Sequence, residues 1–204
     1  MGIYIHGHPF NRQLCRRLAA SAGPPRGASK IYVSRSRLPA GGGGFVNEAL
    51  VDDYFRAEGY TILHPQEITV REQIAAYRAA DQLVLADGSA VHLYALVARP
   101  EQRVFAIWRR GKYSIYNWQI GTFGGPPVLG ESCVDELWVP EHEATHATFG
   151  RAVLNFPALA EQLHAAGFIT SPTWTGPDET EVRQHLASIM EATGHRYIRI
   201  PVPA

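Results

Sequence analysis

Short apolar segments alternate with amphipathic segments between residues 30 and 108 of the chain. Four apolar segments have the length and composition of buried strands, namely Ile31–Ser34, Tyr60–Leu63, Leu83–Ala86 and Arg103–Trp108. Helical periodicity fills the stretches between them, at residues 48–58, 69–79 and 88–97. The order β-α-β-α-β-α-β with short turns predicts an α/β fold, a Rossmann-like parallel sheet with helices on both faces.

Local signals support the helices of this pattern. Asn47 stands where a helix cap is expected and Gly59 where that helix should end. Thr69 is followed three residues later by Glu72, which is the pattern of a capping box.

The flanking segments are less regular. We expect helices at 11–22, 141–150, 156–166 and 178–193, strands at 134–139 and 198–202, a flexible glycine-rich loop at 37–44, and a loop at 110–132. This predicts an N-terminal helix and linker at 1–29 and a single Rossmann-like domain at 30–204.

Composition excludes several classes. The 204 residues include 19 basic and 19 acidic side chains, so no net charge draws the chain to nucleic acid. Two cysteines are too few for a disulfide framework and predict reduced thiols. No apolar run is long enough to span a membrane, and the start lacks the pattern of a secretory signal. We therefore expect a cytoplasmic protein with no integral membrane segment and no nucleic-acid partner.

Polar residues follow two of the predicted strands, at the sheet edge where α/β proteins bind ligands. Ser34, Arg35 and Arg37 follow the first strand, and arginine offers a planar cationic fork suited to phosphate oxygens. The alternative is a solvated loop. Residues 87–92, Asp-Gly-Ser-Ala-Val-His, follow the third strand. Small residues there let a backbone and a helix N-terminus approach an anion, whereas the alternative is a tight turn with a core histidine.

His142, Glu143 and His146 match H-E-x-x-H, a zinc metalloprotease signature. On a helix the two histidines would share one face, with Glu143 as general base. Pro140 would place His142 in a fraying first turn, and no further histidine follows at metzincin spacing. We keep a zinc hydrolase as the less favoured alternative and expect no metal.

Several short motifs in order resemble the glycosyltransferase family 61 type domain, found in capsular polysaccharide biosynthesis proteins. They are Ile31-Tyr32-Val33-Ser34-Arg35, Asn47-Glu48, Gly59-Tyr60, Pro65-Gln66-Glu67, Thr69 with Glu72 and Gln73, Ala80-Asp81, and Gly88-Ser89-Ala90-Val91-His92. The resemblance covers about a third of the chain. It implies the C-terminal, donor-binding half of an inverting, metal-independent GT-B glycosyltransferase, with a nucleotide-diphosphate sugar as donor and no cofactor.

Carried over position by position, the resemblance places Ser34, Arg35 and Arg37 on the diphosphate and makes Gly88, Ser89 and Ala90 the phosphate-facing turn. His92 becomes a nearby polar contact. Glu67 and Glu72 would orient loops or the nucleoside. Asp87 departs from the His-Gly of many members, and would have to face ribose hydroxyls or be neutralised by Arg35.

About thirty residues precede the first motif strand, too few for an N-terminal acceptor domain. The resemblance therefore leaves the catalytic base unassigned. Two functions remain open: glycosyl transfer to a glycan or polysaccharide acceptor, with a separate acceptor-domain protein or a second copy as partner, or a non-catalytic binding or scaffold role.

Overall fold

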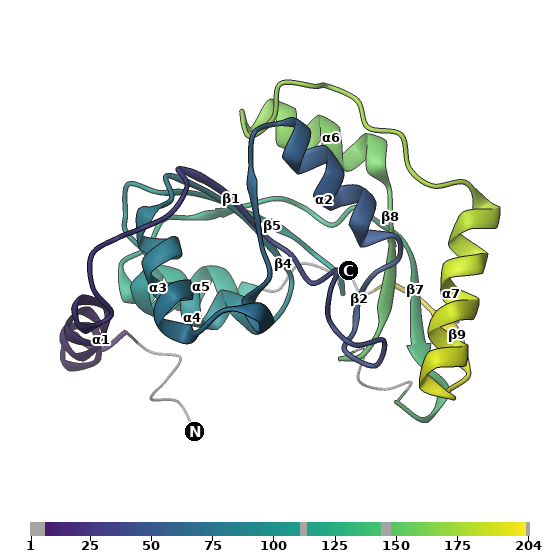
Figure 1. Cartoon of the computed structure of the whole chain (residues 1–204), viewed down its shortest axis with the longest axis horizontal. Coiled ribbons are helices and arrows are strands. Elements are labelled where there is room, and N and C mark those ends of the chain that lie inside the picture. Colours follow the sequence, from purple (N-terminus) through teal and green to yellow (C-terminus); the bar gives the residue numbers. More distant parts are fainter. Residues whose placement is uncertain (1–6, 111–113, 144–147, 203–204) are drawn as a thin grey trace.

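The computed structural model describes residues 7–110, 114–143 and 148–202. Its centre is a parallel five-stranded sheet in the order β3-β1-β4-β5-β6. The strands are β1 (Lys30–Val33), β3 (Thr61–Leu63), β4 (Gln82–Ala86), β5 (Arg103–Ile107) and β6 (Val128–Leu129). The predicted α/β class and parallel sheet are confirmed (Figure 1).

Helices cover both faces of this sheet (Figure 1). On one face lie α1 (Pro9–Ser21), α3 (Val70–Ala79), α4 (Ala90–Val97) and α5 (Ser114–Phe123). Tyr77 and Tyr94 from these helices pack with Ile31, Leu83 and Val104 of the strands. On the other face lie α2 (Glu48–Ala57) and α6 (Phe156–Ala165).

The core under α2 and α6 is rich in aromatic residues. Tyr32 stacks on Phe55 at a centroid distance of 4.5 Å, and Phe55 meets Trp174 edge-on at 5.2 Å. Alternate residues of each strand therefore enter two separate cores. This explains why the strands read as continuous apolar runs rather than as apolar–polar alternation.

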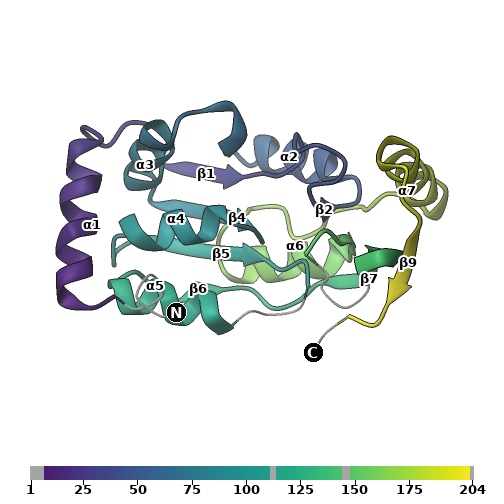
Figure 2. The ribbon, with the colours of Figure 1, turned by 90° about the horizontal axis from the view of Figure 1, so that it is seen from below.

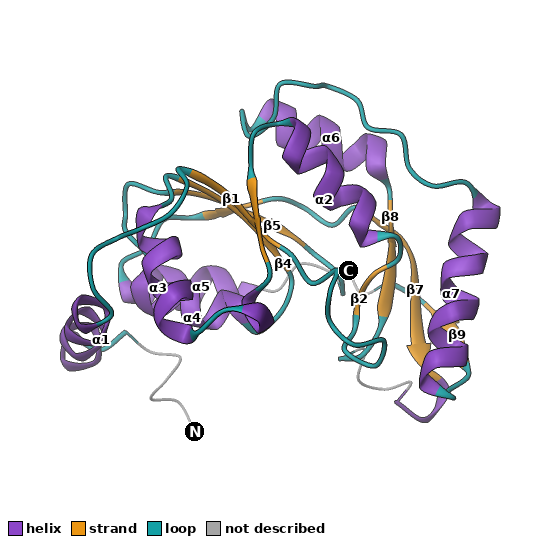
Figure 3. Ribbon diagram, viewed as in Figure 1, coloured by secondary structure: helices purple, strands orange, loops and turns teal. Residues whose placement is uncertain are grey.

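A second sheet of four strands stands beside the first (Figure 3). Its order is β2-β8-β7-β9, formed by β2 (Gly44–Phe45), β8 (Arg151–Leu154), β7 (Val134–Pro140) and β9 (Tyr197–Ile200). β2 is parallel to β8, and β7 is antiparallel to both β8 and β9. Helix α7 (Glu179–Thr193) packs on this sheet through Val182 and Leu186.

The structure corrects three predicted segments. The predicted loop at 110–132 contains helix α5. The predicted flexible loop at 37–44 ends in strand β2, which Gly44 and Phe45 form by pairing with Arg151 and Ala152. The helix predicted at 141–150 is not formed at either described end of that segment. At one end η2 (Glu141–Glu143) is a single 3₁₀ turn, and at the other residues 148–150 lead directly into β8.

Other predictions are confirmed. Thr69 and Glu72 form the expected capping box, and Asp178 caps α7 with a second one. Asn47 stands at the N-cap of α2, but in a left-handed conformation (φ 56°) and without a side-chain capping bond. Its backbone N–H instead donates to His185 Nδ1 at 2.9 Å, which ties α2 to α7. Both cysteines are free thiols.

Candidate donor-binding site

The sheet order places a switch point between β1 and β4. The chain leaves β1 through α2 on one face and leaves β4 through α4 on the other, so the two connections diverge at the carboxyl ends of these neighbouring strands. In Figure 2 the arrowheads of β1, β4 and β5 point the same way, away from α1. Open α/β sheets bind ligands in the crevice at such a point.

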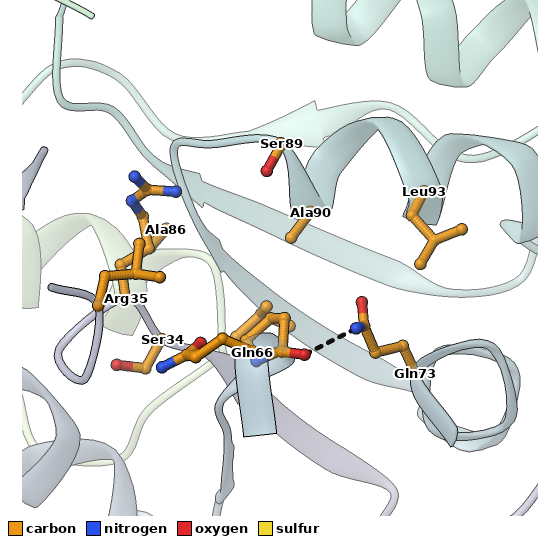
Figure 4. A pocket seen from close by; sticks show the side chains of 11 residues that line it. Ser34, Arg35, Gln66, Gln73, Ala86, Ser89, Ala90 and Leu93 are labelled. Carbon is orange, nitrogen blue, oxygen red and sulfur yellow. Dashed lines mark hydrogen bonds between the residues drawn. The ribbon is translucent and has the colours of Figure 1, made fainter. Parts of the chain in front are cut away.

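A cavity of about 480 Å³ opens there (Figure 4). Among the predicted site residues, Ser34, Arg35, Ser89 and Ala90 line it. The remaining lining residues are Val33, Leu38, Pro65, Gln66, Gln73, Ala86 and Leu93. The structure thus brings the residues after β1 together with the turn after β4, as the order of the motifs predicted.

Arg35 spans the two sides of the switch point. Its Nη2 donates to Gly42 O at 2.6 Å and to Gly43 O at 3.0 Å. Its Nη1 lies directly above Gly88, where an added Cβ would be only 2.3 Å from that nitrogen. Gly88 is therefore required for the approach of the guanidinium, and within the described chain no hydrogen bond occupies Nη1.

Glu48 is a buried carboxylate that organises the loop after β1. Its Oε1 accepts from the backbone N–H of Arg35 at 2.7 Å and from the hydroxyls of Tyr32 and Ser34 at 3.2 and 3.3 Å. Its Oε2 accepts from Phe45 N–H at 3.3 Å. Burial raises the pKa of Glu48, and these backbone donors oppose that rise.

Ser34 is fully buried and serves this loop through its hydroxyl. Its Oγ lies 3.1 Å from Ser36 Oγ, and Ser36 in turn donates to the buried Asp52 at 2.6 Å. His64 Nε2 lies 4.0 Å from the same Asp52 carboxylate. Burial lowers the pKa of His64, outweighing the attraction of Asp52.

Asp87 is fully buried and faces cations other than Arg35. Arg110 Nε lies 3.3 Å from its Oδ2, and Tyr116 OH donates to its Oδ1 at 3.1 Å. The backbone N–H of Arg109 approaches the same carboxylate at 3.4 Å. The charge of Asp87 is thus neutralised by Arg110, and this carboxylate ties the segment after β5 and helix α5 to the turn after β4.

Arg109 and Arg110 extend the cationic side of this edge, and the sequence reasoning missed both. Arg109 Nη1 donates to Thr148 O at 3.0 Å and Gly150 O at 2.9 Å. Burial lowers its pKa to about 10, against the attraction of Asp87. Their position directly after the fourth predicted strand, at the same sheet edge as Arg35, is the sequence signal that indicates them.

Besides Asp87 and Gly88, four predicted site residues do not line the cavity: Arg37, Glu67, Glu72 and His92. Arg37 is exposed and pairs with Glu67 at 2.9 Å beside a separate cavity of about 450 Å³. His92 is exposed, with its Nδ1 2.7 Å from Gln119 Oε1. Glu72 is exposed and occupied by its capping box, where hydrogen bonds from Thr69 lower its pKa.

The H-E-x-x-H motif lies largely outside the described residues. His142 and Glu143 belong to the 3₁₀ turn η2, whereas His146 falls in 144–147. The His142 ring lies 4.5 Å from that of His195. In the part of the chain that the structure describes, no three His, Cys, Asp or Glu side chains form a group that could hold a metal ion. No helix of the same part is long and apolar enough to cross a membrane.

A doubly covered parallel sheet with a cavity at its switch point defines a Rossmann-like α/β protein. The family model described as Glycosyltransferase 61 matches residues 4–105, half of the 204-residue chain. The chain therefore belongs to the glycosyltransferase 61 family. The match runs from α1 into β5, and includes every residue that lines the cavity. No curated protein matches the sequence.

Proposed function

We propose that this protein binds a nucleotide-diphosphate sugar in the cavity between β1 and β4 and transfers its glycosyl group to a glycan or polysaccharide acceptor without a metal ion. One observation carries the proposal: Arg35 Nη1 lies above the Gly88 turn, at the rim of a cavity at the switch point. Membership of the glycosyltransferase 61 family supports the class of reaction.

The diphosphate is assigned to the side of the cavity where α4 begins. Ser89 stands at the N-cap of α4 and lines the cavity. Its hydroxyl makes no capping hydrogen bond and is therefore available to a ligand. The backbone N–H groups at a helix N-terminus favour an anion. Together with Arg35 they supply the charge-assisted donors that a diphosphate requires.

These groups would act mainly on the leaving group. In an inverting transfer, the acceptor oxygen forms its bond to the anomeric carbon while the bond to the diphosphate oxygen breaks. Negative charge then develops on the diphosphate, and fixed donors stabilise it more strongly than they stabilise the bound donor. Gln66 and Gln73 line the other wall; Gln73 Nε2 donates to Pro65 O at 2.8 Å, so the exposed Gln66 is the neutral amide that suits sugar or nucleoside hydroxyls.

A second candidate function, binding without catalysis, rests on the same cavity. None of its described lining residues is Asp, Glu or His, so its wall offers no ordinary general base for the acceptor hydroxyl. A transferase would then receive its base from a separate acceptor-domain protein or from another copy of the chain. A binding or scaffold protein would need none.

Calorimetric titration with a panel of UDP-, GDP- and CMP-linked sugars tests the binding step. Arg35→Ala should weaken the affinity by about 1.5–3 kcal/mol, the range for a hydrogen bond to a charged group. Arg37→Ala is the matched control, because Arg37 pairs with Glu67 outside the cavity, and it should change the affinity little. Equal affinities for the wild type and Arg35→Ala would refute the assignment.

Product analysis separates the two candidates. Incubation with the donor that binds, with and without glycan acceptors and neighbouring proteins, should yield transfer or slow donor hydrolysis if the protein is a transferase. Tight donor binding with neither product under any of these conditions would assign the binding role.

A further inference from the structure

Helix α1 presents its apolar side chains to solvent. Phe10, Leu14 and Leu18 follow one another at intervals of four residues, so they form one stripe along the helix. They are 68%, 47% and 56% exposed. The helix packs on the domain through Ala19, the one buried residue within it. The apolar stripe therefore does not contribute to the core.

The apolar surface continues across a pocket from α1 to α3 and α4. This pocket, of about 360 Å³, is lined by Cys15 and Leu18 on one side and by Val70, Ile74 and Leu93 on the other. Val70 is itself 58% exposed. Four of the eight large apolar side chains exposed in the described residues thus gather here. A concentration of this kind marks an interaction surface, whereas scattered exposed residues do not.

Arginines border this surface. Helix α1 carries Arg12, Arg16 and Arg17 and has no acidic residue. Arg17 lies beside the apolar stripe, whereas Arg12 and Arg16 lie on the other side of α1, in a second pocket of about 370 Å³ with Arg78, Arg99 and Glu101. Arg71 lines the apolar pocket on the α3 side. The carboxylate of the neighbouring Glu72 is hydrogen-bonded to Thr69 in the capping box of α3.

We propose that this surface, defined by Phe10, Leu14, Leu18, Val70 and the flanking Arg17 and Arg71, docks on an anionic lipid bilayer. A helix with an apolar stripe and arginines beside it lies in the plane of a bilayer, with the apolar side chains among the acyl chains and the cations at the headgroups. Charge complementarity selects this occupant. Two copies of the chain that met through α1 would bring their positively charged arginines together, and like charges repel.

The arrangement also argues against an acceptor-carrying protein as the occupant. Figure 2 shows α1 at the end of the molecule where the strands begin, whereas the donor cavity lies where β1 and β4 end. A partner that delivers an acceptor must reach the donor cavity. Leu93 lines both pockets, but Figure 4 shows it at one end of the donor cavity and Arg35 at the other, so docking through α1 leaves the Arg35 end open.

Vesicle flotation with the full chain tests the proposal. Wild-type protein should float with vesicles containing about a third phosphatidylglycerol in phosphatidylcholine, should remain unbound with pure phosphatidylcholine, and should be released by high salt. Leu14→Gln with Leu18→Gln should lower the partition coefficient at least about tenfold. Arg17→Ala with Arg71→Ala, which removes two exposed cations of this surface, should lower it about 10–30-fold.

Matched controls come from other surfaces. Leu129→Gln changes an exposed leucine of β6, and Arg196→Ala an exposed arginine near β9. Both should float as the wild type does. Because all substituted side chains are exposed, circular dichroism should report an unchanged fold for each variant. Absence of flotation, equal binding to neutral vesicles, or an equal loss in the controls would overturn the proposal. So would a dimer in light scattering that Leu14→Gln and Leu18→Gln abolish.

Discussion

The contact between Gly88 and Arg35 makes Gly88→Ala a sharp test of the site. A Cβ at residue 88 would lie 2.3 Å from Arg35 Nη1 and 3.1 Å from its Cζ. The guanidinium must therefore retreat by ~1 Å to reach ordinary van der Waals separation. The backbone itself does not oppose alanine, because Gly88 is not among the glycines with a positive φ.

The cost of this retreat can be worked out from the bonds that it disturbs. Arg35 Nη2 holds Gly42 O at 2.6 Å and Gly43 O at 3.0 Å. Two such bonds contribute about 1 kcal/mol each. We expect Gly88→Ala to lower the free energy of unfolding by about 1–2 kcal/mol in urea denaturation. Donor affinity should fall with it, because Nη1 no longer holds its place at the cavity rim.

A double-mutant cycle isolates the cause. In an Arg35→Ala background the added methyl meets no guanidinium. Gly88→Ala should then be neutral, or stabilising by about 0.4–1 kcal/mol as a glycine replaced without strain. Gly121→Ala is the control for the glycine effect itself, since a Cβ at residue 121 would have no neighbouring atom within 4 Å and the residue sits inside α5. An equal cost of Gly88→Ala in both backgrounds would refute the contact.

Other parts of the site support three further predictions. Gly43→Ala should destabilise the protein by about 1–3 kcal/mol in thermal or urea unfolding, because Gly43 has φ 48° and an added Cβ would lie 2.8 Å from Thr148 O. Gly41→Ala is the control and should be nearly neutral, since a Cβ there meets open space. Equal effects of the two substitutions would contradict the close packing of this loop. Glu48→Ala should lower the free energy of unfolding by about 2–5 kcal/mol, since it leaves buried donors such as Arg35 N–H and Tyr32 OH without their acceptor. A loss of stability no larger than that caused by Glu101→Ala, at an exposed glutamate, would contradict this role of Glu48. Burial lowers the pKa of both His64 and His185, so the unfolded chain binds protons more readily than the folded one. Stability, measured as Tm, should therefore fall as the pH drops from about 7.5 through the ordinary histidine pKa toward about 5.5. The fall in Tm should be smaller for His64→Asn with His185→Asn, and an identical fall would remove the histidines as its cause.

Much of the first sheet could be predicted because its signals are local. Each strand from β1 to β5 in that sheet is a short apolar run bounded by a turn, and the box of Thr69 and Glu72 marks the start of α3 within four residues. The order of Ser34-Arg35 and Gly88-Ser89 along the chain was enough to place them together, because parallel strands end at one edge.

Two strands of the second sheet, β7 and β9, match the strands predicted at 134–139 and 198–202, but β2, β8 and the sheet's pairing could not be predicted, because the pairing joins distant residues. Gly44 reads as the end of a glycine run, and it becomes a strand only by pairing with Arg151. Helix α5 was missed for a related reason. Its sequence mixes aromatic, β-branched and glycine residues, and its place is fixed by tertiary contacts such as Tyr116 with Asp87 and Trp108.

The two sheets meet through arginines, and this explains how a glycine-rich loop can serve a binding site. Arg35, Arg109 and Arg151 each donate to backbone carbonyls of the loop segments 39–43 and 148–150. Glycine at 43 and 44 gives these guanidinium groups room, since a Cβ at either position would lie within 2.9 Å of one of them. The glycine-rich loop 39–43 is thus bound by Arg151, which lies in the C-terminal half of the chain and outside residues 4–105 that the family model matches. A change there, at Arg151, should reach the donor cavity through the loop that Arg35 grips.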